Sequence, residues 1–573
     1  MTADTGRVVR VNGPVVEVVG LAAAGMFDLV EVGPARLPGE VTALRDSRCT
    51  VQVYGYAGGL RPGDPATGLG RPLSAWLGPG LLGGVFDGVL QPLRGRGAML
   101  ATGDRTDSAG GVWPFAPSAR AGEWLEPGTC LGTVRESGSI EHRILVPPDV
   151  RGNVEWLAEA GDRGADEVVA VVGAREVRLR NPWPVRRPRP VRARVDAAAP
   201  LLTGQRVLDL LYPVARGSTA AVPGGFGTGK TVLLQQIARW CDADVIVYVG
   251  CGERGNEMAD VLAELPAIED PRTGRSLVER TVIVANTSNM PVMAREASIY
   301  SGITVAEYFR DMGLDSVVIA DSTSRWAEAM REFASRTGQL PAEEGYPATL
   351  ASAMAAFYER AGRVVTLGGA DASVTIVGAV SPPGGDMTEP VTTQTQRFVR
   401  CLWSLDRDLA YARHYPAVSW RDSFSRDAAG LGPWYAERGD RAWSERRTRA
   451  LAALADADRL ESMAQLVGVS ALAPRERVVV LTGRLLREAV LQQSSLSERD
   501  AHCAPAKQAA LLDMVLGVGD RCLELVARGV APPALEAHDF SALLRAREAC
   551  PPDDAETPRR TLRAVLAELE GLR

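Results

Sequence analysis

Residues 224–231 read Gly224-Gly225-Phe226-Gly227-Thr228-Gly229-Lys230-Thr231, and this stretch decides the fold of the segment around it. It matches Gly-x-x-x-x-Gly-Lys-Thr, the pattern of a phosphate-binding loop, and apolar residues at helical spacing follow it through Trp240. Glycines let backbone N–H groups turn inward around a phosphate, and the N-terminus of the next helix adds favourable partial charge. The sequence therefore predicts a nucleotide-binding loop; the alternative is a glycine-rich turn that ends in Lys-Thr by chance.

The two residues that close this loop carry its chemistry. Lys230 has the length and charge to reach the β- and γ-phosphates, so we expect it to act in binding and in catalysis. The Thr231 hydroxyl is a ligand that Mg²⁺ accepts. We therefore expect ATP or ADP to bind along residues 224–231 together with Mg²⁺.

The composition is that of a protein with several domains. At 573 residues the chain exceeds one hydrophobic core, and 46% hydrophobic with 23% charged residues is ordinary for a globular protein. A net charge of −6 and a pI near 5.6 argue against a nucleic-acid surface that works by bulk positive charge. No apolar run approaches the roughly 18–20 residues of a membrane span, and the N-terminus is polar, so we expect a cytoplasmic chain.

Five segments differ in pattern. Residues 1–70 carry short apolar strands between glycine and proline turns, which predicts a small closed β-barrel. Residues 71–112 are a connector rich in Gly, Pro and Leu, and 113–185 are a second, β-rich module. We place the P-loop nucleotide-binding domain at 186–430 and a C-terminal helical domain at 431–573, where glycine is scarcer.

Residues 181–190 read Asn-Pro-Trp-Pro-Val-Arg-Arg-Pro-Arg-Pro. Proline fixes an extended backbone and removes N–H donors, so we interpret this run as a solvated tether rather than an element. Anion binding by its three arginines is the alternative.

After the loop helix the pattern becomes α/β. Continuous apolar strands are expected at 245–249, 281–285, 317–320 and 374–377, separated by stretches long enough for helices. Strands that are apolar on both faces are typical of a parallel sheet covered by helices. The predicted fold is thus multidomain: an N-terminal β-barrel, a β-rich insertion, a central α/β P-loop domain and a helical C-terminal domain.

Two carboxylates follow strands of this sheet. Asp321 comes directly after the strand 317–320, as expected of a Walker-B acid that holds Mg²⁺ through its water shell. The alternative for Asp321 is an N-cap of the helix starting near Ser324.

The second carboxylate, Glu253, follows the strand 245–249. A carboxylate there can orient or deprotonate the water that attacks the γ-phosphate, while the alternative is a surface salt bridge. Arg254 and Arg325 are expected to stabilise charge on the transferring phosphoryl group or to hold Glu253.

Long blocks across nearly the whole chain resemble the catalytic A subunits of V/A-type rotary ATPases, the proton-translocating ATP synthases of archaea and some bacteria. The blocks are GGFGTGKT (224–231), GCGERGNEM (250–258), NTSNMPVMAREASIYSGITVAEYFRDMG (286–313), ADSTSRWAEAMRE (320–332), GYPATLASAMAAFYERAGRV (345–364), GAVSPPGGDMTEPVT (378–392), WPVRRPRP (183–190) and LLTGQRVLDL (201–210).

The resemblance implies ATP hydrolysis or synthesis coupled by rotation to proton transport. It implies a head in which three A and three B subunits alternate, with central and peripheral stalks and, indirectly, a membrane rotor. A B subunit would supply an arginine finger in trans, and the complex would hold the chain at the cytoplasmic face of the cell membrane. The module at 113–180 matches an insertion that paralogous subunits lack.

Motif matching also carries over residue roles. Phe226 and Tyr415 would help to form the nucleotide pocket, with Tyr415 standing where the family usually has Phe. Thr228 stands where eukaryotic relatives carry a redox-controlled cysteine, so we expect no such switch. The block at 420–425, WRDSFS, departs from the usual WLTSYS on the adenine side.

Two other functions fit the same core fold. A ring subunit that binds nucleotide without turning it over is one, but it would not need a water-activating Glu253. A hexameric nucleic-acid translocase is the other, and the acidic balance without a basic, aromatic strand surface argues against it.

Overall fold

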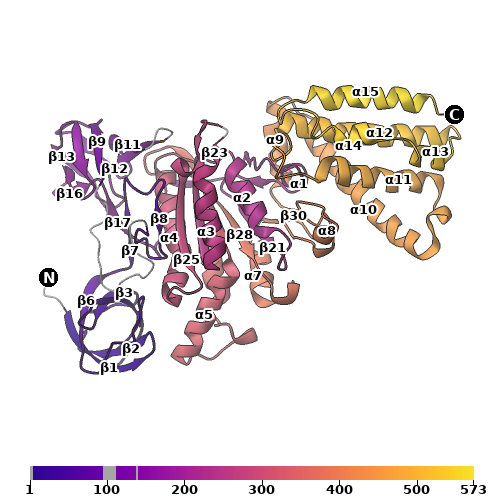
Figure 1. Cartoon of the computed structure of the whole chain (residues 1–573). Helices are drawn as coiled ribbons and strands as arrows, with labels where there is room; N and C mark the ends of the chain where they lie inside the picture. Colours follow the sequence, from indigo (N-terminus) through magenta and orange to yellow (C-terminus); the bar gives the residue numbers. More distant parts are fainter. Residues whose placement is uncertain (1–3, 94–110, 137–139, 271, 573) are drawn as a thin grey trace. The chain divides into compact units, whose positions relative to one another are not determined.

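The computed structural model describes residues 4–93, 111–136, 140–270 and 272–572. They form two compact units (Figure 1). The first unit comprises Met1–Asp196, Ala243–Val380 and Thr393–Phe398. The second comprises Ala197–Asp242, Ser381–Thr392 and Val399–Arg573.

The first unit begins with a closed β-barrel, as predicted. Its strands are β1 (Asp4–Asn12), β2 (Val15–Val19), β3 (Asp28–Val32), β4 (Leu37–Arg45), β5 (Arg48–Val53) and β6 (Pro65–Pro72). They close in the order β1-β2-β5-β4-β3-β6, and β6 pairs back onto β1. Val16, Val18, Val30, Val41 and Val51 fill the interior because side chains alternate between the faces of each strand.

Two antiparallel sheets form the β-rich insertion. One has the order β10-β13-β15-β16 and the other β12-β11-β9-β14. A shared core that includes Phe115, Leu131, Ile144 and Val169 packs between strands of both sheets. The strands are β9 (Val112–Pro117), β10 (Trp124–Leu125), β11 (Cys130–Arg135), β12 (Glu141–Leu145), β13 (Gly152–Leu157), β14 (Gly161–Gly164), β15 (Val168–Val172) and β16 (Arg175–Arg178).

The 181–190 run differs from the prediction. Asn181–Pro184 is a strand, β17, that pairs antiparallel with β7 (Ser74–Leu77). Arg186 forms ion pairs with Glu40 and Glu296, and Arg189 pairs with Asp311. The interpretation as a solvated tether was therefore wrong for these residues: proline is compatible with a short paired strand, and distant carboxylates compensate the arginines.

A parallel sheet forms the rest of the first unit, in the order β28-β26-β22-β25-β8. All four predicted strands are present and almost wholly buried. The strands are β8 (Val85–Phe86), β22 (Val245–Glu253), β25 (Thr281–Thr287), β26 (Ser316–Asp321) and β28 (Asp371–Val380), with β27 (Gly362–Val365) and β18 (Ala193–Val195) added antiparallel. The helices are α3 (Gly255–Glu264), α4 (Val292–Asp311), α5 (Thr323–Thr337) and α6 (Leu350–Tyr358), with short pieces η1 (Leu265–Ala267), β23 (Glu269–Asp270), β24 (Arg275–Ser276), η2 (Leu277–Arg280) and η3 (Glu343–Gly345). Because α4 packs on β22, β25 and β26, its residues are positioned by the sheet (Figure 1).

The second unit holds the phosphate-binding loop and the helical C-terminal part. Its strands are β19 (Pro200–Leu201), β20 (Val214–Ala215), β21 (Thr219–Pro223), β29 (Cys401–Leu402) and β30 (Phe424–Ser425). Its helices are α1 (Arg206–Leu211), α2 (Lys230–Trp240), η4 (Pro383–Gly385), α8 (Arg407–Tyr411), α9 (Ala428–Glu437), α10 (Trp443–Val467), η5 (Val469–Ala471), α11 (Pro474–Leu485), the π-helix η6 (Leu486–Leu491), α12 (Pro505–Ala527), α13 (Pro532–Glu536), α14 (Ser541–Arg545) and α15 (Glu556–Glu570); α7 (Pro390–Phe398) has residues in both units.

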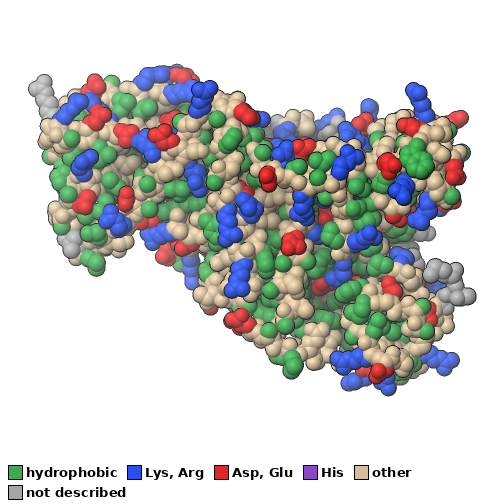
Figure 2. All heavy atoms as spheres, turned by 180° about the vertical axis from the view of Figure 1, so that it is seen from behind, with side chains coloured by type: hydrophobic (Ala, Val, Ile, Leu, Met, Phe, Trp, Pro, Cys, Tyr) green, Lys and Arg blue, Asp and Glu red, His purple; other side chains and the backbone are tan. Residues whose placement is uncertain are grey.

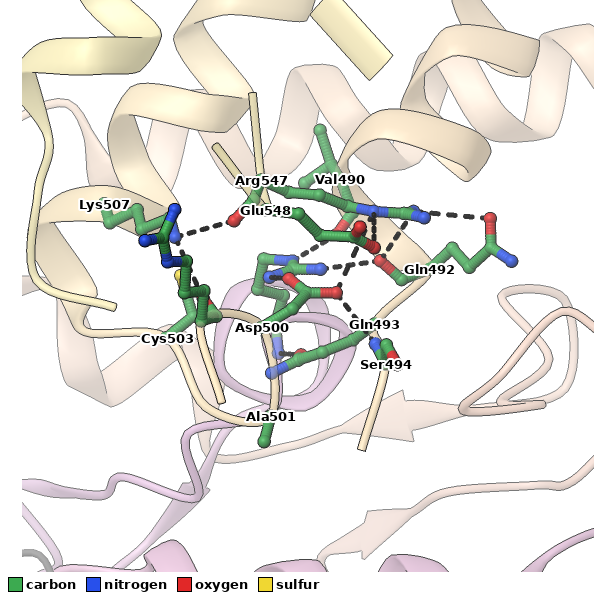
Figure 3. A network of polar contacts seen from close by, with 12 residues as sticks. Val490, Gln492, Gln493, Ser494, Asp500, Ala501, Cys503, Lys507, Arg547 and Glu548 are labelled. Atoms are coloured by element: carbon green, nitrogen blue, oxygen red, sulfur yellow. Dashed lines mark hydrogen bonds and ion pairs between the residues drawn. The ribbon is translucent and has the colours of Figure 1, made fainter. Parts of the chain in front are cut away.

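A buried polar network joins α1 to the C-terminal helices (Figure 3). Arg206, whose side chain is 0% exposed, pairs with Asp500 at 2.6 Å. It also donates to the carbonyl oxygens of Val490 and Gln492. Nearby, the buried Lys507 ammonium donates to four carbonyl oxygens, including those of Arg547 and Cys550. Both cations thus have several acceptors within short range, which is what allows them to be buried.

Within the described ranges, no helix is both long enough and apolar enough to cross a membrane. On the face drawn in Figure 2, acidic and basic side chains are interspersed with hydrophobic ones.

Candidate functional site

The loop at residues 224–231, in the second unit, connects β21 to α2, and the predicted helix through Trp240 is present. Gly229 is the residue just before α2 and has φ of 88°, a left-handed conformation that a side chain disfavours. The Lys230 ammonium donates to the carbonyl oxygens of Gly224 at 2.6 Å and Gly225 at 2.9 Å. Thr228 is buried and its hydroxyl also donates to the Gly225 oxygen. A positive charge and the start of a helix therefore lie together, which suits a phosphate.

Two aromatic side chains lie exposed near this loop. Phe226 at the loop tip is 85% exposed, and Tyr415 is 42% exposed. The Tyr415 ring comes within 3.5 Å of where a Cβ on Gly229 would lie. Exposed rings beside a phosphate loop are available to stack on a nucleobase.

The neighbouring block at 420–425 is engaged elsewhere. Trp420 and Arg421 both donate to the Asp458 carboxylate of α10, at 2.7 and 2.6 Å. The Ser419 hydroxyl donates to Asp422 at 2.8 Å. The departures from the family pattern therefore serve contacts within the second unit.

Asp321 in the first unit ends β26, beside β22. Strand pairing places it opposite Gly250, and it is 3% exposed. The Tyr248 hydroxyl donates to its Oδ2 atom at 3.2 Å. Ser322, not Asp321, is the N-cap residue of α5, so the N-cap alternative does not describe this carboxylate.

Glu253 ends β22 and is half-buried. Burial, then the negative charge of Asp321, and then a hydrogen bond with Glu257 and its charge raise the pKa of Glu253 to about 8, against a partial lowering by Arg325. A carboxyl group with a pKa near the working pH can accept and return a proton, as a general base must. Glu257 was not singled out from the sequence; it lies in the first turn of α3, just after the turn that follows Glu253 at the end of β22.

The predicted arginines occupy different positions. Arg325 lies beside the β22–α3 turn, within 2.9 Å of where a Cβ on Gly252 would lie, and binds both oxygens of Glu328. Arg254 is exposed and is the N-cap residue of α3.

Sequence reasoning missed Arg295, in the first turn of α4. Its side chain is close to the same turn: the Cδ and Nε atoms lie 2.9 and 3.0 Å from where a Cβ on Gly252 would lie. Gly252 has φ of 72°, so a side chain there would be strained as well as crowded. Arg295 donates to the Ser288 oxygen at 2.8 Å, while its buried Nε atom has no hydrogen-bond partner among the described residues. Because the carboxyl ends of β22 and β25 are neighbours, a basic residue soon after the second strand was a usable signal.

Four family models match in chain order. They are the ATP synthase alpha/beta family β-barrel domain (residues 8–70), the ATP synthase alpha/beta subunit barrel-sandwich domain (108–186), the ATP synthase alpha/beta family nucleotide-binding domain (204–425) and the C-terminal domain of V and A type ATP synthase (432–530). These descriptions and the folded elements confirm the predicted fold class, and the third indicates that the chain binds nucleotide.

Curated relatives match along nearly the whole chain. A V-type ATP synthase alpha chain of Nitrosococcus oceani is 48% identical over 99% of this chain and 97% of its own length. The A subunit of the A-type ATP synthase of Methanopyrus kandleri is 49% identical over 92% of this chain and 91% of its own. A V-type ATP synthase alpha chain of Clostridium tetani is 47% identical over 92% of this chain and 91% of its own. The chain therefore belongs to the ATP synthase alpha/beta family, in the group of V-type alpha chains and A-type A subunits, as the sequence resemblance indicated.

Proposed function

We propose that this chain is the catalytic subunit of a V/A-type rotary ATP synthase. It would hydrolyse or synthesise ATP, and rotation would couple that reaction to proton transport across a membrane. The observation that carries the proposal is Glu253, a half-buried carboxyl group with its pKa raised to about 8, at a strand end beside Asp321. A subunit that only binds nucleotide does not need such a base.

The residues at 224–231 would hold the nucleotide. The backbone of the loop and the Lys230 ammonium would bind the phosphates, while Phe226 and Tyr415 would contact the base. The Thr231 hydroxyl in the second unit and the Asp321 carboxylate in the first are each an oxygen donor of the kind that Mg²⁺ prefers, so each fits that ion by its own chemistry. Thr231 would bind it directly and Asp321 through its water shell, and the bound ion would offset the charge of the phosphates.

Glu253 would act on the water. In hydrolysis it orients the water, accepts its proton as the water oxygen bonds to the γ-phosphorus, and the bond to ADP breaks. In synthesis the same proton returns. Arg254, Arg325 and Arg295 would stabilise negative charge near the transferring group or hold Glu253 in place.

The relatives' names place them in ATP synthases, which are multisubunit complexes. We propose that this chain alternates with B subunits in a hexamer, contacts central and peripheral stalks, and reaches the cytoplasmic face of the membrane through the complex. An arginine from a neighbouring B subunit would complete the charge stabilisation, so the isolated chain should be a poor ATPase.

The test is ATP hydrolysis by the chain alone and after assembly with its cognate B and central-stalk subunits. Weak activity that rises at least tenfold on assembly is expected, and Lys230→Ala and Glu253→Gln should each abolish it. Full activity alone would contradict completion by a neighbour. Binding of ATP with no turnover in either preparation would favour the non-catalytic ring subunit.

A further inference from the structure

Arg186 lies between two carboxylates that come from different parts of the first unit. It donates to Glu40 of β4 at 3.1 and 2.9 Å and to Glu296 of α4 at 2.9 and 2.6 Å. Both carboxylates are therefore bound through two hydrogen bonds each. This bidentate geometry is available to a guanidinium and not to an ammonium.

The surroundings hold Arg186 in one place. Its guanidinium lies 4.8 Å from the centre of the Tyr300 ring and 5.3 Å from that of Phe27. The Tyr54 hydroxyl donates to Glu40 at 3.1 Å, and Glu40 is 1% exposed. Losing the arginine would leave two buried carboxylates facing each other, so the contact resists separation.

Glu296 directly follows Arg295 and is the fifth residue of α4, where the second turn of the helix begins. Arg295 lies against Gly252, next to Glu253, and its carbonyl oxygen accepts a contact from the Cys251 thiol at 3.5 Å. Neighbouring residues in a helix point in different directions, so Glu296 can be held on one side of the helix end while Arg295 is presented on another. Any rotation or fraying of this helix end that releases Glu296 also moves Arg295.

We propose that Arg186 is a positioning residue for ATP turnover: by holding Glu296 against Glu40, it fixes the N-terminal end of α4 so that Arg295 stays against Gly252, in the turn that carries Glu253. Arg186 itself lies on the run that sequence reasoning interpreted as a solvated tether. The inference rests on the proposed function, because it matters only if Glu253 acts in catalysis.

The chain offers a matched control in Arg189. It belongs to the same run and binds the same helix, but its Nε donates to Asp311, the last residue of α4, at 2.6 Å. Its guanidinium also stacks on aromatic rings, those of Trp183 and Tyr308. Glu296 and Asp311 are separated by about 22 Å of helix, so loss of Arg189 weakens similar packing far from Arg295.

The experiment compares Arg186→Gln, Arg186→Lys and Arg189→Gln in heads assembled with the cognate subunits. The measurements are kcat, KM for ATP and the midpoint of thermal unfolding. We expect Arg186→Gln to lower kcat at least tenfold with KM changed less than threefold. Arg186→Lys should restore part of the kcat that Arg186→Gln loses, because lysine keeps the positive charge but not the bidentate geometry of the guanidinium. Arg189→Gln should keep kcat within about twofold of wild type at a comparable loss of thermal stability.

Two results would overturn the positioning role: equal kcat losses for Arg186→Gln and Arg189→Gln at equal thermal destabilisation, or wild-type kcat in Arg186→Gln. If Arg186→Gln does not assemble, Arg186→Lys decides, since wild-type kcat there also overturns the role and a severalfold loss supports it. Glu253→Gln in the same assay distinguishes a failure of the proposed function from a failure of the positioning role. If that variant keeps turnover, the proposed function fails; if it is inactive while the arginine variants behave alike, only the positioning role fails.

Discussion

The Tyr248 hydroxyl donates a hydrogen bond of 3.2 Å to the Asp321 carboxylate, and both side chains are buried. Tyr248 lies on β22 and Asp321 ends the adjacent strand β26, so the parallel pairing of the two strands brings them together. Burial and the Asp321 charge raise the pKa of Tyr248, which keeps the hydroxyl protonated as a donor. One oxygen of Asp321 is thereby held in orientation.

Replacing Tyr248 with Phe should weaken the hold on Mg²⁺. Removing the hydrogen-bond partner of a metal-binding group typically costs about 10–100-fold in metal affinity or activity, so we expect the Mg²⁺ concentration for half-maximal ATPase activity to rise roughly tenfold or more. The measurement is a Mg²⁺ titration at saturating ATP. Tyr435→Phe, at a buried tyrosine of the second unit, is the control. An unchanged titration in Tyr248→Phe would show that this hydrogen bond does not orient the metal site.

The raised pKa of Glu253 predicts how activity and stability depend on pH. Because the deprotonated form must accept the proton from water, kcat/KM should rise as pH increases from 6 toward the pKa of about 8. The folded-state pKa exceeds the ordinary value of 4.5, so the folded protein binds this proton more tightly than the unfolded chain does. The stability that comes from protonated Glu253 is therefore present below about pH 4.5, falls progressively above it and is fully lost once pH has risen through about 8.

Glu253→Gln keeps a neutral side chain at every pH. We expect it to be inactive and to unfold at a higher temperature than wild type at pH 9, with the difference shrinking at pH 5. Scanning calorimetry at the two pH values measures this. A stability difference that does not change with pH would mean that Glu253 does not titrate in this range.

The position of Tyr415 predicts that its ring contributes to the affinity for ATP by stacking on the base of the nucleotide. Its ring lies beside Gly229 and is partly exposed, and stacking of an aromatic ring on a base contributes about 1–3 kcal/mol. Tyr415→Phe should leave the Kd for ATP unchanged, whereas Tyr415→Ala should raise it roughly tenfold to a hundredfold. Equilibrium titration with a fluorescent ATP analogue tests both, and equal affinities for the two variants would exclude stacking.

Arg206 and Asp500 form a buried ion pair, so we expect substitution of either residue to destabilise the second unit strongly. Removing one partner leaves a buried charge uncompensated and costs about 3–5 kcal/mol. Arg206→Met and Asp500→Leu should therefore each speed hydrogen exchange of α1 and of residues 486–500, and the double variant should recover part of the protection. Additive losses in the double variant would mean that the two charges are not coupled.

The insertion is joined to α4 through His142. Its Nδ1 atom lies 2.5 Å from a Glu136 oxygen and its Nε2 atom lies 2.7 Å from the Tyr308 hydroxyl, with the ring fully buried. His142→Phe leaves a buried carboxylate and a buried hydroxyl without this partner, so hydrogen exchange in α4 and β12 should accelerate. His538→Phe, at a histidine of the second unit, is the control. Identical exchange in His142→Phe and wild type would show that the contact does not hold the insertion.

Much of the fold and several residues of the candidate site could be predicted from local pattern. The loop at 224–231, the four buried strands and the acids Glu253 and Asp321 at strand ends were all readable, because glycine spacing, hydrophobic runs and strand termini are features of a few adjacent residues. Arg295 was not singled out because its relevance depends on which strand ends are neighbours, and Glu257 was not because the turn between β22 and α3 is what brings it to Glu253.

The sequence by itself determined the loop, the parallel strands and the family, since these depend on short-range periodicity and on long matching blocks. Tertiary structure alone decided the surroundings of Arg186. Its partners lie 146 and 110 residues away in the chain, and the proline-rich run around it reads as solvated. The physical reason is that the free energy of a buried charge depends on the carboxylates that folding brings to it, and local sequence does not encode that distance.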